Sequence, residues 1–535
     1  MNGRLPSMPA EEMPAPAPAG GPPAGQAESS DHSESRAVRP SGRWTRLRAR
    51  VGRVPRAAWI CALLAVVNAA CWSLITPPFQ APDEPAHFAY AQLLAETGNL
   101  PSSSEGDVSQ EELVMTSVLH QFEVQWHPEV KTIDSPSALR ELHQILDSHL
   151  DRVGPGGAGV ARTEPPLYYA LQTIPYRLAS SGSLLDRLEA MRLLSALMAG
   201  LAALFAFLFV RELMPATPWA WTVAGLCAAL TPVLGFTSGV VTPDAMLSAV
   251  CAAVFCCLAR AFRRGLTPPL AIVTGVVVAI GFLTKLNFIG LAPGVMLGLL
   301  VLAFRGVRDG PDGERSRRAF GSMAIAIAIA IAPVVVYLAS NQIEHHPLFG
   351  ILSRSSGGSA LEQSPLHELE YAWQFYLPRL PGMVSYFPGV SVFRELWFDR
   401  IVGIYGWLDT TFPTWVENLA LIPAGLIAVL ALRTLLMCRR ALLSHTSELA
   451  IYAVMAVGLL VLIAADSYTG RALEGPSYLQ PRYLLPLLPL AGVVLAAGAR
   501  GAGKRLGPAA GALIVTLFLA HDIFSQLLVV SRFYG

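Results

Sequence analysis

Three ionisable side chains stand close together directly after the first long apolar stretch of the chain: Asp83, Glu84 and His87. Ionisable groups at the edge of a bilayer are costly unless they bind something, so this group is the first candidate for chemistry. One carboxylate could act as a general base toward an incoming hydroxyl group. The other acid or His87 could hold a divalent cation or orient the molecule that carries the hydroxyl.

Helix capping is the alternative role for the same residues. Pro85 suits the first position of a helix, which we expect to run to about Glu96, and Asp83 before it suits a helix cap. Capping accounts for one acid only. It does not account for Glu84 or for His87, which would lie near Asp83 on the same helix face. We therefore favour catalytic roles for Asp83, Glu84 and His87.

Further polar side chains near the ends of apolar stretches extend the candidate site. Lys285 either snorkels to the membrane surface or contacts a phosphate. Arg482 begins an apolar run, where a cation is costly unless it pairs with a phosphate or a carboxylate. Asp244 is either a helix cap within Thr-Pro-Asp-Ala or a catalytic or metal-binding acid. We expect these residues to bind substrate: Glu164, Tyr168, Lys285, Arg471 and Arg482.

A divalent cation, Mg²⁺ or Mn²⁺, is the one cofactor that the residue types suggest, and its candidate ligands are Asp83, Glu84 and Asp244. The seven cysteines lack metal-ligand spacing and are expected to pack as small apolar residues. The sequence contains no Walker or dinucleotide glycine motif, which argues against a nucleotide-driven site. It also contains no zinc motif and no nucleophile elbow.

Transmembrane helices are the elements that must position these residues. The chain is 53% hydrophobic and only 14% charged, with a mean hydropathy of +0.47, which is typical of a membrane protein. A helix needs about 20 mostly apolar residues to cross a bilayer. By this measure we predict about eleven spans, near residues 57–76, 191–212, 219–238, 245–262, 269–285, 288–305, 320–340, 417–437, 448–465, 483–499 and 507–529.

The distribution of basic residues predicts the orientation in the cell membrane. Arginines are dense before the first span, at 36–56, and alternate connections are basic as well, at 260–264, 305–318, 433–440 and 500–505. Because basic residues favour the cytoplasmic side, the N-terminus is predicted inside and the C-terminus outside. All the candidate site residues then fall on the outer side. The net charge of +1 gives no reason to expect a nucleic-acid partner.

Residues 1–55 are rich in Pro, Ala, Gly, Ser and Arg and are predicted to be a disordered cytoplasmic tail. Residues 56–535 are predicted to form one all-α polytopic membrane domain. This domain includes two large extracytoplasmic loops, at about 77–190 and 341–415, that carry amphipathic helices. The candidate acids, imidazole and cations all fall on the predicted outer side of the membrane. This distribution suggests a single extracytoplasmic active site at the membrane surface.

The order of these motifs resembles a known group. A first span followed by an Asp-Glu pair and a later Pro-Pro-Leu-Tyr-Tyr segment resembles the GT-C superfamily of polytopic glycosyltransferases. The segment 82–88 is similar to the bacterial membrane family catalogued as domain of unknown function 2142. Four later segments are also similar to that family: 242–244, 283–285, 405–409 and 482–486. The resemblance covers nearly everything after residue 55.

The resemblance implies a transferase that uses a polyprenyl-phosphate-linked sugar on the outer face of the membrane. In that interpretation Asp83 is the catalytic base and Glu84 assists the acceptor or a metal ion. Lys285 and Arg482 face the lipid phosphate. The second acid of such enzymes maps to Asp244, although this chain has Pro243 at a position that is often polar in the superfamily.

We therefore expect a hexosyl- or pentosyltransferase that moves a sugar from a polyprenyl phosphate to a cell-envelope glycan. Two other functions stay open: a transporter or flippase of lipid-linked glycans, and a non-catalytic scaffold that binds glycan or lipid. A transporter should carry ionisable residues or broken helices near the middle of the bilayer. The predicted spans contain few ionisable residues, which favours the enzyme.

Overall fold

The computed structural model describes residues 54–101, 108–131, 136–148, 150–154, 159–308, 313–343, 365–474 and 480–535. Within these ranges the regular structure is helical, apart from β1 (Ile404–Tyr405) and β2 (Thr410–Thr411), which pair antiparallel. The predicted all-α architecture is thereby confirmed. The predicted tail lies outside the described ranges except for its last two residues, and it stays a prediction.

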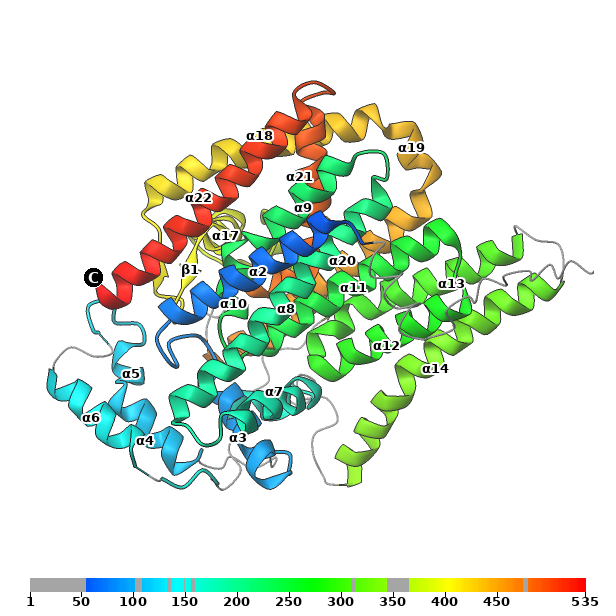
Figure 1. The fold of residues 1–535 in the computed structure, drawn as a ribbon. Helices are drawn as coiled ribbons and strands as arrows, with labels where there is room; N and C mark the ends of the chain where they lie inside the picture. The colour runs from blue at the N-terminus through cyan, green and yellow to red at the C-terminus, as the bar shows by residue number, and fades with distance from the viewer. Residues whose placement is uncertain are drawn as a thin grey trace, which may run out of the picture. The chain divides into compact units, whose positions relative to one another are not determined.

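Nine helices in the described part of the chain are long and apolar enough to cross a membrane. They comprise α2 (Arg56–Ile75), α8 (Leu184–Leu213), α11 (Pro243–Arg264), η2 (Leu286–Leu291) with α13 (Ala292–Arg308), α14 (Gly313–Ile343), α18 (Thr414–Met437), α20 (Thr446–Glu474), η5 (Pro481–Leu487) with α21 (Leu488–Gly501), and α22 (Gly507–Tyr534). Each coincides with a predicted span (Figure 1).

Two predicted spans differ from a simple straight helix. The third is a pair, α9 (Pro218–Ala229) and α10 (Pro232–Ser238), bent by 52° at the break. Pro232 has no backbone N–H and pushes Thr231 into an extended conformation, so the helix cannot continue through this point. The side-chain amide of Asn68 on α2 donates to the carbonyl of Ala229 at 3.1 Å. The fifth, α12 (Pro268–Thr284), has 17 residues and is shorter than the others.

Small side chains allow the helices nearest the first span to approach closely. Alanines of α8, including Ala199 and Ala203, pack against Ala65 and Ala69 of α2 in one buried cluster. Close backbone approach at small residues is the usual way in which membrane helices associate, because lipid supplies no hydrophobic force between them. The helix α11 is the most enclosed of the spans, with 89% of its apolar window buried. It therefore provides a rigid support for the residues at its N-terminus.

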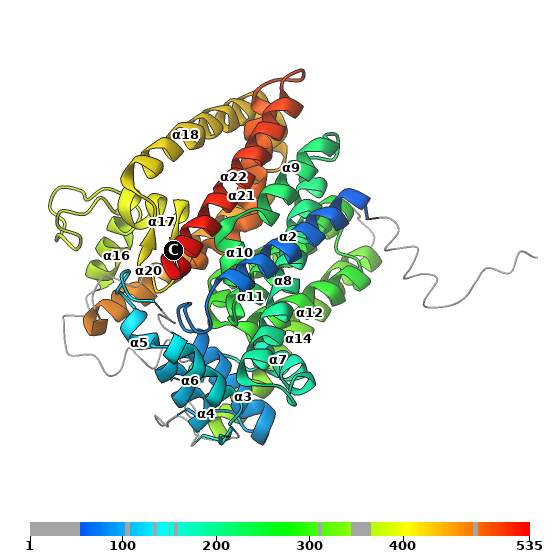
Figure 2. The same ribbon diagram turned by 60° about the vertical axis from the view of Figure 1, so that its left-hand side comes forward.

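Short helices make up the two predicted outer loops. The first contains α3 (Glu84–Thr97), α4 (Gln110–Val118), α5 (Gln121–Val124), α6 (Pro136–Leu146), η1 (Gly159–Thr163) and α7 (Leu167–Leu178). The second contains α16 (Pro365–Gln374), the π-helix η3 (Val392–Phe398), α17 (Asp399–Val402) and the two strands. A further short helix, α19 (Arg439–Ser444), precedes α20. Figure 2 shows α3, α4, α6 and α7 gathered at one end of the spans.

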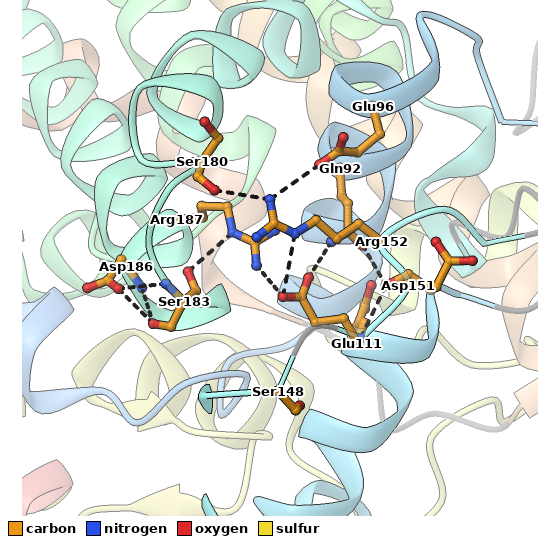
Figure 3. A network of polar contacts seen from close by, with 12 residues as sticks. Gln92, Glu96, Glu111, Ser148, Asp151, Arg152, Ser180, Ser183, Asp186 and Arg187 are labelled. Atoms are coloured by element: carbon orange, nitrogen blue, oxygen red, sulfur yellow. Dashed lines mark hydrogen bonds and ion pairs between the residues drawn. The ribbon is translucent and has the colours of Figure 1, made fainter. Parts of the chain in front are cut away.

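The buried guanidinium of Arg187 fastens the first loop to α8 (Figure 3). It pairs with Glu111 of α4 and donates to the hydroxyl of Tyr176 of α7 at 2.8 Å. The same Glu111 accepts from the amide of Gln92 of α3 at 3.0 Å. Arg152 adds a hydrogen bond to the carbonyl of Ser180 at 3.1 Å. The guanidinium of Arg187 thus links four helices, α3, α4, α7 and α8, directly or through Glu111.

We predict that Arg187→Met destabilises the folded chain by about 3 kcal/mol, because it leaves the Glu111 carboxylate largely buried without its main cation. Thermal unfolding in detergent and limited proteolysis of the first loop measure the effect. Arg152→Met is the matched control, since the side chain of Arg152 is 34% exposed whereas that of Arg187 is fully buried. Equal stability of the two variants would contradict the anchoring role of Arg187.

Candidate functional site

The carboxylate of Asp83 does not cap α3. Asp83 occupies the N-cap position in the left-handed conformation, with φ of 67°, and its side chain makes no capping hydrogen bond. Its Oδ2 instead pairs with the Nη2 of Arg482, which is 399 residues away in the sequence and lies in η5. Arg482 also donates to the carbonyl of Pro82 at 3.1 Å. The structure therefore brings together the predicted base and one of the predicted phosphate-binding cations.

The carboxylate of Asp244 joins this pair to the second predicted cation. Its Oδ2 accepts from the Nζ of Lys285 at 2.9 Å and lies 3.4 Å from the Nε of Arg482. Thr242 is the N-cap of α11, because its hydroxyl accepts from the amide of Asp244. The capping role that was left open for Asp244 is thus wrong. Asp244 serves instead as a buried bridge between the two cations.

Glu164 completes the group on the side of Lys285. One of its carboxylate oxygens lies 4.0 Å from the Nζ of Lys285. Its Oε2 is buried and has no hydrogen-bonding partner among the described residues. Burial raises the pKa of Glu164, although Lys285 opposes the shift. We name Asp83, Glu164, Asp244, Lys285 and Arg482 the charged cluster.

Exposure distinguishes the members of the charged cluster. The side chain of Asp83 is 31% exposed, whereas those of Asp244, Lys285 and Arg482 are almost fully buried. Burial alone would raise the pKa of Asp83, but the guanidinium of Arg482 holds it below its ordinary value. An incoming molecule therefore meets Asp83 first, as an ionised carboxylate.

His87 and Tyr168 lie beside the charged cluster and have other partners. The Nδ1 of His87 lies 2.8 Å from the hydroxyl of Tyr169, and the ring of Tyr169 stacks on Tyr90. Burial lowers the pKa of His87 to about 3, against the opposing charge of Asp83, so the imidazole is neutral. Tyr168 faces the opposite way and hydrogen-bonds Ser195 of α8 at 2.8 Å. Sequence reasoning chose Tyr168 and missed Tyr169, the tyrosine that contacts His87.

Glu84 points away from Asp83 and is fully occupied. Its Oε1 accepts from the Nε of Arg192 at 2.8 Å and from the amide of Val241 at 3.0 Å. Its Oε2 accepts from the Nη2 of Arg192 at 2.7 Å and from the amide of Phe79 at 3.1 Å. Both residues of this pair are fully buried. We therefore treat Glu84 as a positioning residue.

Arg192 is a functional residue that the sequence analysis did not single out; it lies at the start of the predicted second span, 191–212. The helix α8 begins at Leu184 and carries Arg192 inward. Besides Glu84, its guanidinium donates to the carbonyls of Ser73, Thr76 and Pro77 at 3.0, 2.8 and 3.2 Å. One side chain thus holds the whole turn between α2 and α3.

The three predicted metal ligands do not form a donor set. The oxygens of Glu84 are taken by Arg192 and two backbone amides, and Asp83 and Asp244 are paired with Arg482 and Lys285. Within the described ranges, no three His, Cys, Asp or Glu side chains are grouped to hold a metal ion. The residues present do not fit the suggested cation. The side chain of Arg471 lies outside the described part of the structure.

The fold and the site define a polytopic helical membrane protein with a charged cluster where five segments distant in sequence meet. The family model described as "Predicted membrane protein (DUF2142)" matches residues 66–491, and the chain belongs to this family. The resemblance of the sequence motifs to that family is thereby confirmed. No curated protein matches the chain.

Among solved structures, the chain is similar to an oligosaccharyltransferase of Archaeoglobus fulgidus, crystallised with a tethered acceptor peptide that contains the NVT sequon. The identity is 11% and the TM-score is 0.41. The match covers 89% of this chain and 55% of the other, so this chain spans about half the length of that enzyme.

We predict that Glu84→Gln lowers the free energy of unfolding by about 3–5 kcal/mol, because it leaves the guanidinium of Arg192 buried without a counter-charge. Thermal unfolding of the detergent-solubilised chain tests this. Glu189→Gln is the control, since Glu189 also lies beside Arg192, at 3.3 Å, but is 41% exposed. A loss in Glu84→Gln no larger than in the control would disprove the positioning role.

Acid should destabilise the chain through His87. The pKa of His87 is about 3 in the folded chain and about 6.5 when unfolded, so between these values only the unfolded chain binds the proton. Its stabilising contribution is complete above pH 6.5 and is lost as the pH falls. From pH 7 to 5 the loss should reach about 2 kcal/mol. His87→Gln should reduce this pH dependence in thermal unfolding, and an unchanged slope would show that His87 does not cause it.

Proposed function

We propose that this protein is an integral membrane glycosyltransferase, which moves a hexosyl or pentosyl group from a polyprenyl phosphate to an extracytoplasmic glycan of the cell envelope. The observation that carries the proposal is the contact between Asp83 and Arg482, with Arg482 and Lys285 joined by Asp244. A partly exposed carboxylate next to two cations at the ends of membrane spans suits proton removal beside a lipid-borne phosphate.

The reaction assigns a role to each charged group. The acceptor hydroxyl oxygen attacks the anomeric carbon of the donor sugar and forms the new glycosidic bond. Its proton passes to the carboxylate of Asp83. The bond between the anomeric carbon and the phosphate oxygen breaks, and the electron pair leaves with the polyprenyl phosphate. Arg482 and Lys285 stabilise the negative charge that develops on this leaving group.

The supporting residues hold this geometry without touching the reacting atoms. Arg192 and Glu84 fix the turn that carries Asp83, and the bond from Val241 to Glu84 fixes the segment that leads to Asp244. Positioning of this kind matters because misplacement by about 1 Å can cost about a hundredfold in rate.

A transporter would use ionisable groups inside the spans, and one such group is Asp522 of α22. Its carboxylate accepts from the indole of Trp72 at 3.0 Å and from the amide of Gln526 at 3.1 Å. The bond from Trp72 links α22 to α2, and the two bonds together satisfy the carboxylate within the bundle. Asp522 is therefore accounted for by helix packing. The break between α9 and α10 is accounted for by Pro232 and is satisfied by Asn68, so we keep the enzyme as the single proposed function.

The decisive variant is Asp83→Asn, which we expect to fold normally and to lower the rate of sugar transfer at least about a hundredfold. Cells that lack the protein should lose one sugar from an envelope glycan, measured by composition and linkage analysis. The wild-type chain should restore this sugar and Asp83→Asn should not.

Asp399→Asn is the matched control for this experiment. It alters another outer-loop aspartate that pairs with an arginine, Arg394, at 2.8 Å. This variant should restore the sugar fully. Restoration by a well-folded Asp83→Asn would refute the assignment of Asp83 as the base, and an unchanged glycan profile in cells without the protein would refute the transferase itself.

A further inference from the structure

The charged cluster contains more acids than cations. Three carboxylates, those of Asp83, Glu164 and Asp244, surround the two cations Lys285 and Arg482. Arg482 is already engaged by Asp83, by Asp244 and by the carbonyl of Pro82. A phosphate that approached this arrangement unchanged would meet an excess of negative charge. One carboxylate must therefore give up its cation when the phosphate binds.

Asp83 is the acid that can leave. It is the most exposed member of the cluster, and among the described residues its carboxylate forms an ion pair with one cation, Arg482. Asp244 is almost fully buried and is held by Lys285 and by the hydroxyl of Thr242 as well. Glu164 does not contact Arg482. Its exposure and its ion pair thus both indicate Asp83 as the carboxylate that can leave Arg482.

We propose that the donor binds by exchange: its phosphate replaces the carboxylate of Asp83 on Arg482, and the released carboxylate then accepts the proton of the acceptor hydroxyl. This inference rests on the proposed function and adds an order to it. The donor binds first, and the base becomes competent only when the donor phosphate is in place.

The exchange resolves a conflict within the site. A carboxylate paired with a guanidinium is a weak base, because Arg482 lowers the pKa of Asp83. A phosphate on Arg482 neutralises that cation and places further negative charge nearby, so the affinity of Asp83 for a proton rises. Phosphate is also a suitable replacement, since a guanidinium binds carboxylate and phosphate with the same paired donors.

Two substitutions remove the carboxylate while keeping the backbone. Asp83 has φ of 67°, a conformation that Asn and Gly accept more readily than most residues. Asp83→Asn and Asp83→Gly should therefore both fold, which thermal unfolding checks. Arg482→Gln removes the cation, and Asp399→Asn serves again as the matched control.

The experiment measures binding of farnesyl phosphate to the full-length chain in detergent, with farnesol and inorganic phosphate as separate probes. The wild-type chain should bind farnesyl phosphate more tightly than either. Both Asp83 variants should bind it about three- to tenfold more tightly than the wild type, because Asp83 no longer competes for the guanidinium. Arg482→Gln should weaken binding, and Asp399→Asn should not change it.

Variants that combine Arg482→Gln with each Asp83 substitution separate exchange at Arg482 from a general effect of removing a negative charge. If Asp83 competes for Arg482, removing Asp83 should give no gain once Arg482 is Gln. A gain that persists in the Arg482→Gln background would overturn the exchange, as would the absence of any gain in both Asp83 variants. Either result leaves the transferase intact if Asp83→Asn still abolishes transfer.

The probes test the source of the phosphate. Equal affinity for inorganic phosphate and farnesyl phosphate would overturn the assignment to a lipid-borne phosphate. Wild-type binding of farnesyl phosphate no tighter than that of farnesol would overturn the exchange together with the polyprenyl phosphate donor of the proposed function. The failure of the inference and the failure of the function therefore give different results.

Discussion

The ion pair between Glu84 and Arg192 is the constraint on which the site depends. Arg192 binds both carboxylate oxygens and three backbone carbonyls, and Glu84 in turn receives two backbone amides. A buried pair of this kind is worth little as a source of stability, but it is costly to break because each ion has given up its water. Its effect here is geometric, because it fixes the turn after α2 against α8 and against the segment before α11. The turn contains Asp83, and the segment before α11 leads directly to Asp244.

Once these segments are fixed, electrostatics organises the remainder of the charged cluster. Asp244 sits between Lys285 and Arg482, so the two cations stay close together in spite of their mutual repulsion. Glu164 approaches Lys285 and carries an oxygen that has no hydrogen-bonding partner in the described part of the chain. Burial strengthens each of these interactions, since little water is present to screen them. The result is a site whose members depend on one another.

Hydropathy predicted the positions of the spans well, because apolar length is a local property of the sequence. The common sidedness of the acids and cations also predicted that Asp83, Lys285 and Arg482 would gather. The sequence did not predict the directions in which neighbouring side chains point. Neighbouring residues of α7 lie about 100° apart, so Tyr168 and Tyr169 have different partners. Asp83 stands before the helix in a left-handed conformation, so its carboxylate and that of Glu84 also reach different partners. The sequence left open whether Arg482 pairs with a phosphate or a carboxylate, because nothing local marks its contact with Asp83 across 399 residues.

The break between α9 and α10 has a consequence for biogenesis. The carbonyl of Ala229, beside the break, is satisfied by the side-chain amide of Asn68 on α2. In hydrocarbon an unsatisfied carbonyl is expensive, so the bent segment is stable only when the first span is already docked beside it. The first span must then stay near the site of insertion while the loop and α8, which separate it from α9, are made. The bend between α9 and α10 is therefore completed late in assembly, when Asn68 of α2 contacts the carbonyl of Ala229.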